Sequence, residues 1–275
     1  MERRRLGSGR RPPRDKALDL DDIIYGVHAV EEALTAAEPV RRIHVGDDRK
    51  RDPALRQLIE RAAELGIPVR FESRSFFSQF PYRAHQSVVA FGEPFAYVTL
   101  DEALAHRAAP RGHRLLVVLD HITDPHNAGA IIRTAECAGA DAVVLPERRA
   151  AGVNATVRKA AAGATAHLPI ARVANVASAL RTLRKANLWV AGAALDPAAV
   201  AYTTADFDRD IALVIGAEGS GISPVVRKEC DYLVRIPHFG QIDSLNASVA
   251  AGVLLYEIRR QREASAAREA ARSPA

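Results

Sequence analysis

The stretch LLVVLDHITDPHNAGAIIRTAE, residues 115–136, decides the fold. Its first five residues are apolar and end at Asp120, a pattern typical of a strand that is buried on both faces of a parallel sheet. A polar loop follows, and residues 127–139 then predict a helix. A buried strand that leads through a polar loop into a helix predicts an α/β fold.

The downstream sequence repeats this alternation. Further strands are predicted at residues 142–146, 188–193, 211–216 and 232–237, and further helices at residues 154–163, 176–186, 223–231 and 244–262. Strands and helices at this spacing predict a doubly wound parallel sheet. Ligands bind such sheets beyond the carboxyl ends of the strands. The polar loops DHITDPHNAG, GAEGSGIS and PHFGQIDSLNAS are therefore expected to line one site.

The N-terminal part predicts a second, smaller α/β unit. It contains short apolar strands and the helical stretch DPALRQLIERAAELG, in which Asp52 is a candidate N-cap and Gly66 a stop. The predicted division is a disordered basic tail at 1–20, the small domain at 21–93, a linker at 94–113, the main domain at 114–262 and a disordered tail at 263–275.

Charge and cysteine content narrow the function. The 275 residues carry a net charge of +5, which favours a polyanionic partner. The arginine-rich segment 1–16 either contacts phosphates or only solubilises the chain. Cys137 and Cys230 form no C-x-x-C pair and predict buried apolar side chains. No apolar run approaches the roughly 20 residues of a membrane span, so the sequence predicts a cytoplasmic protein with no membrane partner.

Common nucleotide-binding motifs fit poorly. The segment Gly216–Gly221 reads G-x-x-G-x-G rather than G-x-G-x-x-G, and it lies late in the chain. No G-K-[ST] loop is present, so a kinase or an NAD-dependent oxidoreductase is only an outside alternative. His121 and His126 have no third ligand at a suitable spacing, so no metal site is predicted.

Three ordered motifs resemble the SpoU (TrmH-like) branch of the SPOUT RNA methyltransferases. Each follows a predicted strand, and together they extend over about 130 residues. The matching residues are Asn127, Gly129 and Arg133 in the first motif, Gly216, Glu218 and Gly221 in the second, and Ile236, Pro237, Ser244, Leu245, Asn246 and Ser248 in the third.

The N-terminal unit resembles the substrate-binding domain of the RlmB-type ribosomal RNA 2′-O-ribose methyltransferases. The resemblance rests on YGVHAVEEAL, residues 25–34, and HQSVVA, residues 85–90. It implies a domain similar to a small ribosomal protein, with His28, His85 and Gln86 as RNA contacts.

The resemblance also implies a deep trefoil knot around the parallel sheet and S-adenosylmethionine as cofactor. The implied cofactor-binding residues are Ala193, Gly216, Ile236, Ser244 and Leu245. A missing Cβ at Gly216 would let the ligand approach the main chain, although a tight turn would explain this glycine equally. The family further implies a homodimer whose active site is completed across the interface, and apolar side chains of the last helix supply a candidate dimer surface.

The implied catalytic residues are Arg133, Asn127, Glu218, Asn246 and Ser248. Proposals for the family make Arg133 a general base, but arginine stays protonated in proteins, so we expect an electrostatic clamp on phosphate and developing alkoxide. Its alternative is a surface pair with Glu136. Asn127 and Ser244 could instead be plain helix N-caps. Glu218 is expected to organise the site through Asn127, Arg133 or backbone amides.

The resemblance predicts methylation of a ribose 2′-hydroxyl, with a guanosine of 23S ribosomal RNA as the expected target. Phe239 and Asp243 depart from the family's usual residues and could shift the specificity. Two alternatives stay open: an antibiotic-resistance ribosomal RNA or tRNA ribose methyltransferase of the same family, and an RNA-binding protein without activity.

Overall fold

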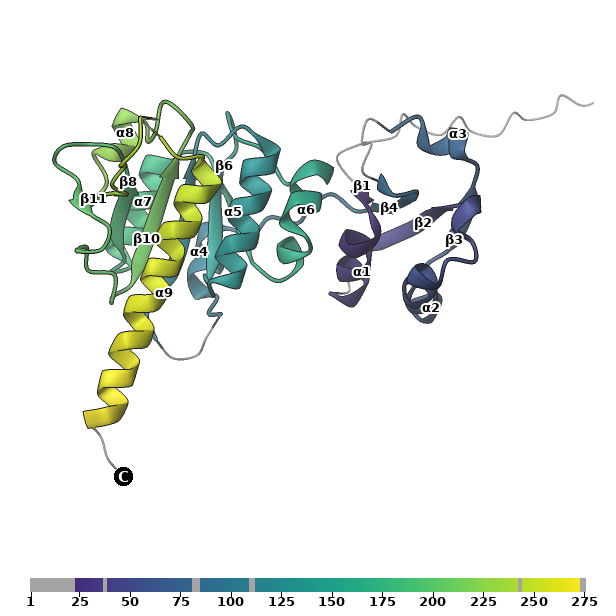
Figure 1. Cartoon of the computed structure of the whole chain (residues 1–275), viewed down its shortest axis with the longest axis horizontal. Coiled ribbons are helices and arrows are strands. Elements are labelled where there is room, and N and C mark those ends of the chain that lie inside the picture. Colours follow the sequence, from purple (N-terminus) through teal and green to yellow (C-terminus); the bar gives the residue numbers. More distant parts are fainter. Residues whose placement is uncertain (1–22, 37–38, 81–84, 109–111, 242–243, 273–275) are drawn as a thin grey trace, which may run out of the picture.

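The computed structural model describes residues 23–36, 39–80, 85–108, 112–241 and 244–272. Within these ranges the chain forms one sheet of four strands and one of seven (Figure 1). The basic tail predicted at 1–20 lies outside the described residues.

The four-stranded sheet has the order β1-β4-β2-β3, with β2 and β3 parallel and the other pairs antiparallel. Its elements are β1 (Ile23–Tyr25), α1 (Val27–Thr35), β2 (Val40–Gly46), α2 (Arg56–Glu64), β3 (Val69–Glu72), α3 (Arg74–Phe77) and β4 (Val88–Gly92). Asp52 caps a short 3-10 turn that precedes α2 rather than α2 itself. Gly66, with φ of 68°, lies just beyond the end of α2, as predicted.

The seven-stranded sheet has the order β7-β6-β5-β10-β8-β11-β9, and all its pairs are parallel. Its strands are β5 (Leu115–Asp120), β6 (Ala142–Pro146), β7 (Ile170–Val173), β8 (Trp189–Ala193), β9 (Val200–Ala201), β10 (Ile211–Gly216) and β11 (Tyr232–Arg235). Its helices are α4 (Leu100–Ala105), α5 (Pro125–Cys137), α6 (Ala155–Ala161), α7 (Val176–Lys185), α8 (Pro224–Arg227) and α9 (Ala247–Arg272). The predicted parallel α/β sheet is confirmed.

Strand β5 is buried on both faces, as its sequence predicts. Leu115, Val117 and Leu119 belong to the apolar core that α5 and α9 cover. Leu116 and Val118 point to the opposite face and join the core beneath α4 and α7. Helices therefore cover both faces of the sheet, and its carboxyl edge stays open for loops (Figure 1).

Two predicted boundaries are wrong. Residues 263–272 are not a disordered tail, because α9 continues to Arg272 through a stretch of good helix formers with an Arg259–Glu263 pair one turn apart. The segment 94–113, predicted as a linker that contains a short helical stretch, is part of the large domain. Its helix α4 starts with a capping box at Thr99 and buries Ala103 in the core of the large sheet.

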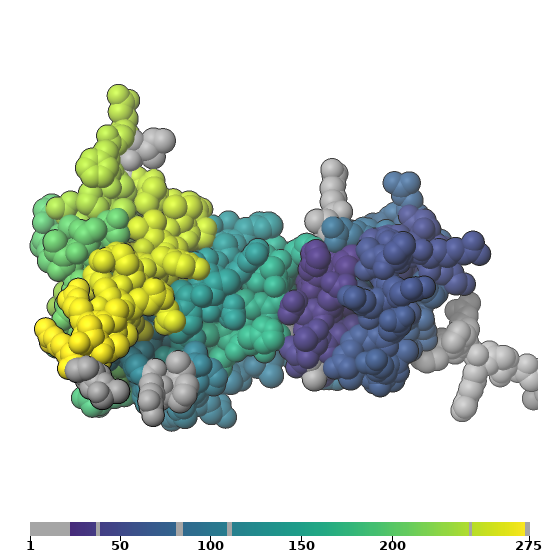
Figure 2. Space-filling view, turned by 60° about the horizontal axis from the view of Figure 1, so that its bottom comes forward, coloured from purple at the N-terminus to yellow at the C-terminus, as the bar shows by residue number. Residues whose placement is uncertain are grey.

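The small domain packs on the large one through α6, which lies between α5 and β1 (Figure 1). Ala155 of α6 joins an apolar cluster of the small domain that includes Tyr25. Gly129 lets α5 approach α6 closely: a Cβ there would lie 2.5 Å from the Ala160 Cβ. Figure 2 shows the resulting contact, with the purple and blue small domain against the teal helices.

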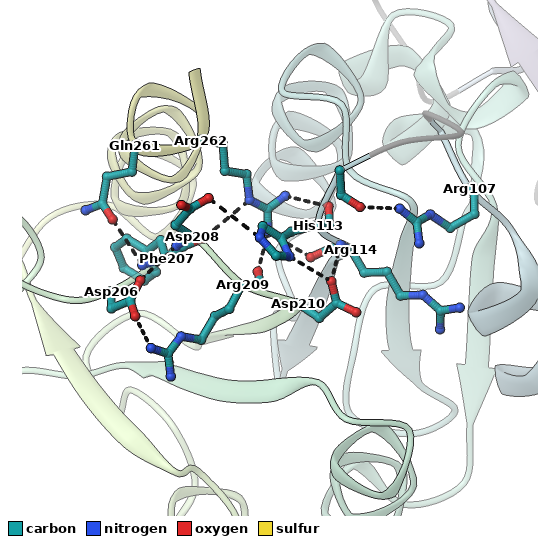
Figure 3. A network of polar contacts seen from close by, with 11 residues as sticks. Arg107, His113, Arg114, Asp206, Phe207, Asp208, Arg209, Asp210, Gln261 and Arg262 are labelled. Atoms are coloured by element: carbon teal, nitrogen blue, oxygen red, sulfur yellow. Dashed lines mark hydrogen bonds and ion pairs between the residues drawn. The ribbon is translucent and has the colours of Figure 1, made fainter. Parts of the chain in front are cut away.

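At the amino edge of the large sheet, Arg262 of α9 fastens the helix to two loops, at residues 113–114 and 207–209 (Figure 3). Its guanidinium donates to the carbonyl oxygens of His113 at 2.9 Å, Arg114 at 2.8 Å and Arg209 at 2.9 Å, and more weakly to that of Phe207. Burial lowers the pKa of Arg262. These bonds fix α9 about four turns from its start, on the side of the sheet opposite to the predicted site.

Two features of the described ranges bear on membranes and metals. No helix there is long and apolar enough to cross a membrane. No three histidine, cysteine, aspartate or glutamate side chains in the same ranges are grouped as metal ligands would be.

Candidate active site

Three segments at the carboxyl edge of the large sheet bring Asn127, Glu218 and Asn246 into one hydrogen-bonded cluster. The Asn127 Nδ2 donates to Glu218 Oε1 at 2.9 Å, and Asn246 Nδ2 donates to Asn127 Oδ1 at 2.9 Å. Asn246 Nδ2 also donates to Glu218 Oε1. The three residues come from the three sequence motifs and are separated by up to 119 positions, so the fold unites them.

The helix caps differ from those predicted. Asp124, not Asn127, caps α5, and it accepts from the His126 backbone N–H at 2.9 Å. Asn127 is buried inside the first turn. Asn246, not Ser244, caps α9: its Oδ1 accepts from the Ser248 backbone N–H at 2.9 Å and from the Ser248 hydroxyl at 2.6 Å. Each asparagine is thus held by a helix start.

Glu218 is the acceptor at the centre of the cluster. Besides the two asparagine amides, its Oε1 accepts from the Ala247 backbone N–H at 3.3 Å. A carboxylate at this position is stabilised by the positive end of the α9 dipole. No hydrogen bond of Glu218 Oε2 occurs within the described residues, so this oxygen can accept another donor. The predicted organising contacts form with Asn127 and with a backbone amide, but not with Arg133.

Arg133 lies apart from this cluster. It is on the exposed side of α5 and makes no hydrogen bond or ion pair with any described residue, so the alternative pairing with Glu136 is absent. Ser248 joins the cluster only through Asn246. Within one chain, the fold unites Asn127, Glu218, Asn246 and Ser248 and leaves Arg133 outside.

A cavity opens beside the cluster, and all five predicted cofactor residues line it: Ala193, Gly216, Ile236, Ser244 and Leu245. Its volume is about 220 Å³, many times the roughly 15 Å³ that one water needs on this measure. The walls are largely apolar side chains and backbone, and Glu218 contributes a carboxylate. Small residues at the strand ends leave room for a ligand the size of a nucleoside.

The reason for glycine at position 216 is the turn. A Cβ there would overlap the backbone of Gly221 and Ile222, because the loop folds back on itself through a bridge between Ala217 and Gly221. The expected close approach of a ligand is therefore not needed to explain Gly216. The turn directs Glu218 towards α9.

Sequence reasoning missed Asp120 and Arg227. Asp120 is fully buried and accepts from the Ser223 backbone N–H at 2.7 Å, while His121 Nδ1 lies 2.6 Å from its other oxygen. It thereby ties the end of β5 to the loop that carries Glu218. An aspartate that closes an apolar strand was the available signal. Arg227 lines the cavity and holds the pKa of Asp196 below its usual value through an ion pair.

The three predicted RNA contacts belong to the small domain. His28 is exposed, with Nδ1 3.4 Å from Glu31. Gln86 accepts from the Val27 backbone N–H at 3.3 Å. His85 stacks on Phe77, and burial lowers its pKa. Gln86 and His28 are therefore close to each other, whereas His85 is partly occupied in packing.

Phe239 is 97% exposed, more than the other large apolar side chains of the described residues. It belongs to the loop between β11 and α9, and Figure 2 shows a yellow-green segment of this region projecting from the surface. Asp243 lies outside the described residues.

Comparison with protein families gives two matches that cover both domains. A family model described as the SpoU rRNA Methylase family matches residues 114–256. A model described as RNA 2′-O ribose methyltransferase substrate binding matches residues 23–98. The first match alone covers more than half of the chain.

Two relatives of known sequence agree. An uncharacterized tRNA/rRNA methyltransferase of Synechocystis sp. is 42% identical over 258 residues, which cover 91% of this chain and 66% of that protein, so the chain spans slightly less than two thirds of that relative. A protein of Staphylococcus haemolyticus assigned to the TrmH family of tRNA/rRNA methyltransferases is 36% identical over 88% of this chain and 96% of its own length.

Solved structures match across both domains. The AviRb SpoU methyltransferase of Streptomyces viridochromogenes, in complex with AdoMet, aligns with a TM-score of 0.72 at 28% identity and covers 88% of this chain and 90% of its own. An AdoMet-bound rRNA methyltransferase of Sinorhizobium meliloti aligns with a TM-score of 0.71 at 27% identity, covering 87% of each chain.

These matches confirm the family, the α/β fold, the enzyme class and the cofactor that the three motifs predicted. The trefoil knot and the likeness of the small domain to a ribosomal protein stay predictions. The chain belongs to the SpoU methylase family, as an S-adenosylmethionine-dependent RNA 2′-O-ribose methyltransferase.

Proposed function

We propose that this chain methylates the ribose 2′-hydroxyl of a guanosine in 23S ribosomal RNA, in the manner of the RlmB-type enzymes. The observation that carries the chemistry is the Asn127–Glu218–Asn246 cluster beside the cavity at the carboxyl edge. The ribosomal target is supported by the family description and by the N-terminal motifs. A relative from Sinorhizobium meliloti is likewise an rRNA methyltransferase.

The cavity fits S-adenosylmethionine. Ala193, Ile236 and Leu245 offer an apolar surface for a flat adenine ring, and the backbone at Gly216 and Ser244 offers hydrogen-bonding groups. When bound, the cofactor supplies an electrophilic methyl group on a sulfonium. Every other requirement, which is to bind, orient and deprotonate the ribose hydroxyl, falls to the protein and to solvent.

Glu218 is the group that orients the hydroxyl. Its Oε1 is held by the amides of Asn127 and Asn246, which fixes the carboxylate and leaves Oε2 able to accept the ribose O–H. A fixed acceptor reduces the entropy lost in reaching the reactive geometry. Ser248 supports the arrangement because its hydroxyl donates to Asn246 Oδ1 and keeps that side chain from rotating.

Arg133 acts as an electrostatic clamp in the partner's site of a homodimer. Its exposed guanidinium does not reach the cluster of its own chain. Val249 and Tyr256 on the neighbouring helix α9 are 51% and 54% exposed and supply apolar surface for a second copy. The guanidinium stays protonated and can bind the phosphate next to the target ribose and stabilise alkoxide charge.

Radioactive methyl transfer tests the function. Purified protein is incubated with labelled S-adenosylmethionine and, in turn, unmodified 23S ribosomal RNA, 16S ribosomal RNA and tRNA, and the 2′-O-methyl position is mapped. We expect one labelled guanosine in 23S RNA. Label in tRNA alone would move the target to the tRNA alternative, and no label in any RNA would favour the RNA-binding protein without activity.

Subunit mixing tests the shared site. Arg133→Ala is expected to lower kcat about 1,000-fold while the Kd for S-adenosylmethionine changes little. If Arg133 serves the partner's site, mixing Arg133→Ala with Glu218→Ala protomers leaves one intact site in each heterodimer and restores about one quarter of wild-type activity. No recovery in the mixture would place Arg133 in the site of its own chain.

A further inference from the structure

Two exposed arginines follow strand β6 at the carboxyl edge. Arg148 and Arg149 lie in the loop between β6 and α6, and both side chains are exposed. Neither makes a hydrogen bond or an ion pair with any residue in the described part of the chain. Two unpaired guanidinium groups on neighbouring residues repel each other slightly, so a bound anion would relieve their interaction.

The loop that carries them is firmly held. At its start, the Glu147 backbone N–H donates to the Val173 carbonyl at 2.9 Å. At its end, the Ala151 backbone N–H donates to the Ile122 carbonyl at 2.8 Å, and Val153 donates to the Tyr97 hydroxyl at 2.7 Å. The arginines are therefore presented on a fixed support rather than on a free loop.

The bond from Ala151 ties the arginine loop to the loop that leads into the active site. Ile122 belongs to the loop between β5 and α5, the helix whose first turn contains the buried Asn127. Arg149 itself has a left-handed backbone, with φ of 58°, which is strained for a residue with a side chain. The anchored ends keep the backbone in this conformation.

The loop leads directly into α6, the helix that contacts the small domain. Strands β6 and β7 form the side of the sheet next to the small domain, and β10, which carries Glu218, lies beyond β5. Helix α6 starts directly after the loop and, with seven residues, is about 10 Å long. Its Lys159 packs against Gly26, two residues before the predicted RNA contact His28.

We propose that Arg148 and Arg149 form a phosphate-binding site that guides the RNA strand from the small domain to the active site. The proposal rests on the proposed function, since it assumes an RNA substrate that contacts both domains. Guanidinium groups bind phosphate oxygens in a planar, two-point geometry, and a chain of phosphates would pass both arginines in turn. Glu147 is the acidic neighbour in the loop, and its exposed side chain does not pair with either arginine.

The test is the salt dependence of RNA binding by the double variant R148A/R149A. Binding of 23S ribosomal RNA fragments is measured at several salt concentrations by fluorescence anisotropy. Loss of two phosphate contacts is expected to reduce the slope of log Kd against log salt by about 1.5 and to raise the KM for RNA roughly 10- to 50-fold. The Kd for S-adenosylmethionine and kcat at saturating RNA should stay close to wild type.

Two further variants make the result specific. R148K/R149K keeps the charges and should retain most of the slope. R268A/R272A removes two arginines that are equally exposed and unpaired in the described structure, but lie at the far end of α9, and should leave the slope unchanged. An unchanged slope in R148A/R149A, or an equal decrease in R268A/R272A, would overturn the proposal.

Failure of the proposed function and failure of the phosphate site would give different results. If wild-type protein binds RNA but methylates none, the target reaction is wrong, whereas the slope still decides the role of the arginines. If wild type methylates RNA and R148A/R149A does so with an unchanged KM, only the phosphate site is wrong.

Discussion

The two edges of the seven-stranded sheet both carry networks of side chains that join distant segments, yet they use polar groups differently. At the carboxyl edge, Glu218 binds Asn127 and Asn246, keeps one carboxylate oxygen available and faces a cavity. At the amino edge, the guanidinium of Arg262 donates its hydrogen bonds to backbone carbonyl oxygens (Figure 3). A network with unused capacity beside a cavity serves chemistry, and a network that is satisfied internally serves stability.

The comparison predicts the largest effect at Glu218. Replacing Glu218 with Ala leaves both asparagine amides without their shared acceptor, so kcat/KM for RNA should fall at least about 100-fold. Glu218→Gln keeps the shape and should recover part of the activity. Methyl transfer and thermal unfolding are measured in parallel. If Glu218→Ala lowers Tm so far that the protein is largely unfolded at the assay temperature, the lost activity reflects lost folding. The carboxyl-edge network would then be structural.

Arg262 should show the opposite behaviour. Arg262→Met removes the hydrogen bonds to the carbonyls of His113, Arg114 and Arg209 and is expected to cost about 2 kcal/mol of unfolding free energy, or about 5 °C in Tm. Specific activity at 25 °C should stay within about twofold of wild type, because the active site lies at the other edge. Calorimetry and methyl transfer check the two halves of this prediction. If Arg262→Met keeps the wild-type Tm but loses activity, the amino-edge network serves the reaction rather than stability, and the prediction is wrong.

The sequence predicted one edge far better than the other. The motif residues Asn127, Glu218 and Asn246 could be placed at the carboxyl edge because each follows an apolar strand, and parallel strands share their carboxyl edge. The amino-edge network leaves no such pattern, since Arg262 binds carbonyl groups that every residue possesses. Arg262 also lay at the end of the predicted helix, where side-chain periodicity gives no hint of a buried guanidinium.

Local signals failed where several residues could serve the same purpose. Asn127 and Ser244 both look like helix caps, but Asp124 and Asn246 hold those positions because chain geometry sets where each helix begins. Gly216 could be explained by a ligand or by a turn, and only the folded loop decides for the turn. The position of Arg133 outside its own cluster depends on which face of α5 is covered, which one motif does not define.

A smaller effect on Tm is expected from lowering the pH, through Glu257 of the long helix α9. Glu257 of α9 accepts from Arg260 and Gln261, and mainly the Arg260 contact lowers its pKa below the usual value. A lowered folded-state pKa stabilises the fold above the unfolded-state pKa, and this contribution is lost as the pH falls through the folded-state pKa. We expect the Tm of wild type to exceed that of Glu257→Gln by about 2 °C at pH 7.

The Tm values of the same two proteins should converge as the pH falls through the lowered folded-state pKa of Glu257, where its carboxyl group takes up a proton. Thermal unfolding from pH 3 to 8 supplies the comparison, with methyl transfer at pH 7 as a control that should not change. A Tm difference that persists unchanged at pH 3 would show that packing, not charge, accounts for Glu257.

The smallest effect is expected from removing the last turns of α9, which separates the anchored part of the helix from the part beyond it. Residues 266–272 are helical but fully on the surface, whereas Gln261 and Arg262 just before them hold the loops at residues 205–209 and 113–114. A chain that ends at residue 265 keeps both anchors. Its Tm should therefore fall by less than about 2 °C, and its far-UV circular dichroism should lose only the helical signal of the deleted residues.

A chain that ends at residue 260 loses both anchors and should be destabilised at least as much as Arg262→Met. If the two truncations behave alike, the stabilising role of the amino edge does not reside in Gln261 and Arg262, and the contrast between the two edges loses its physical basis.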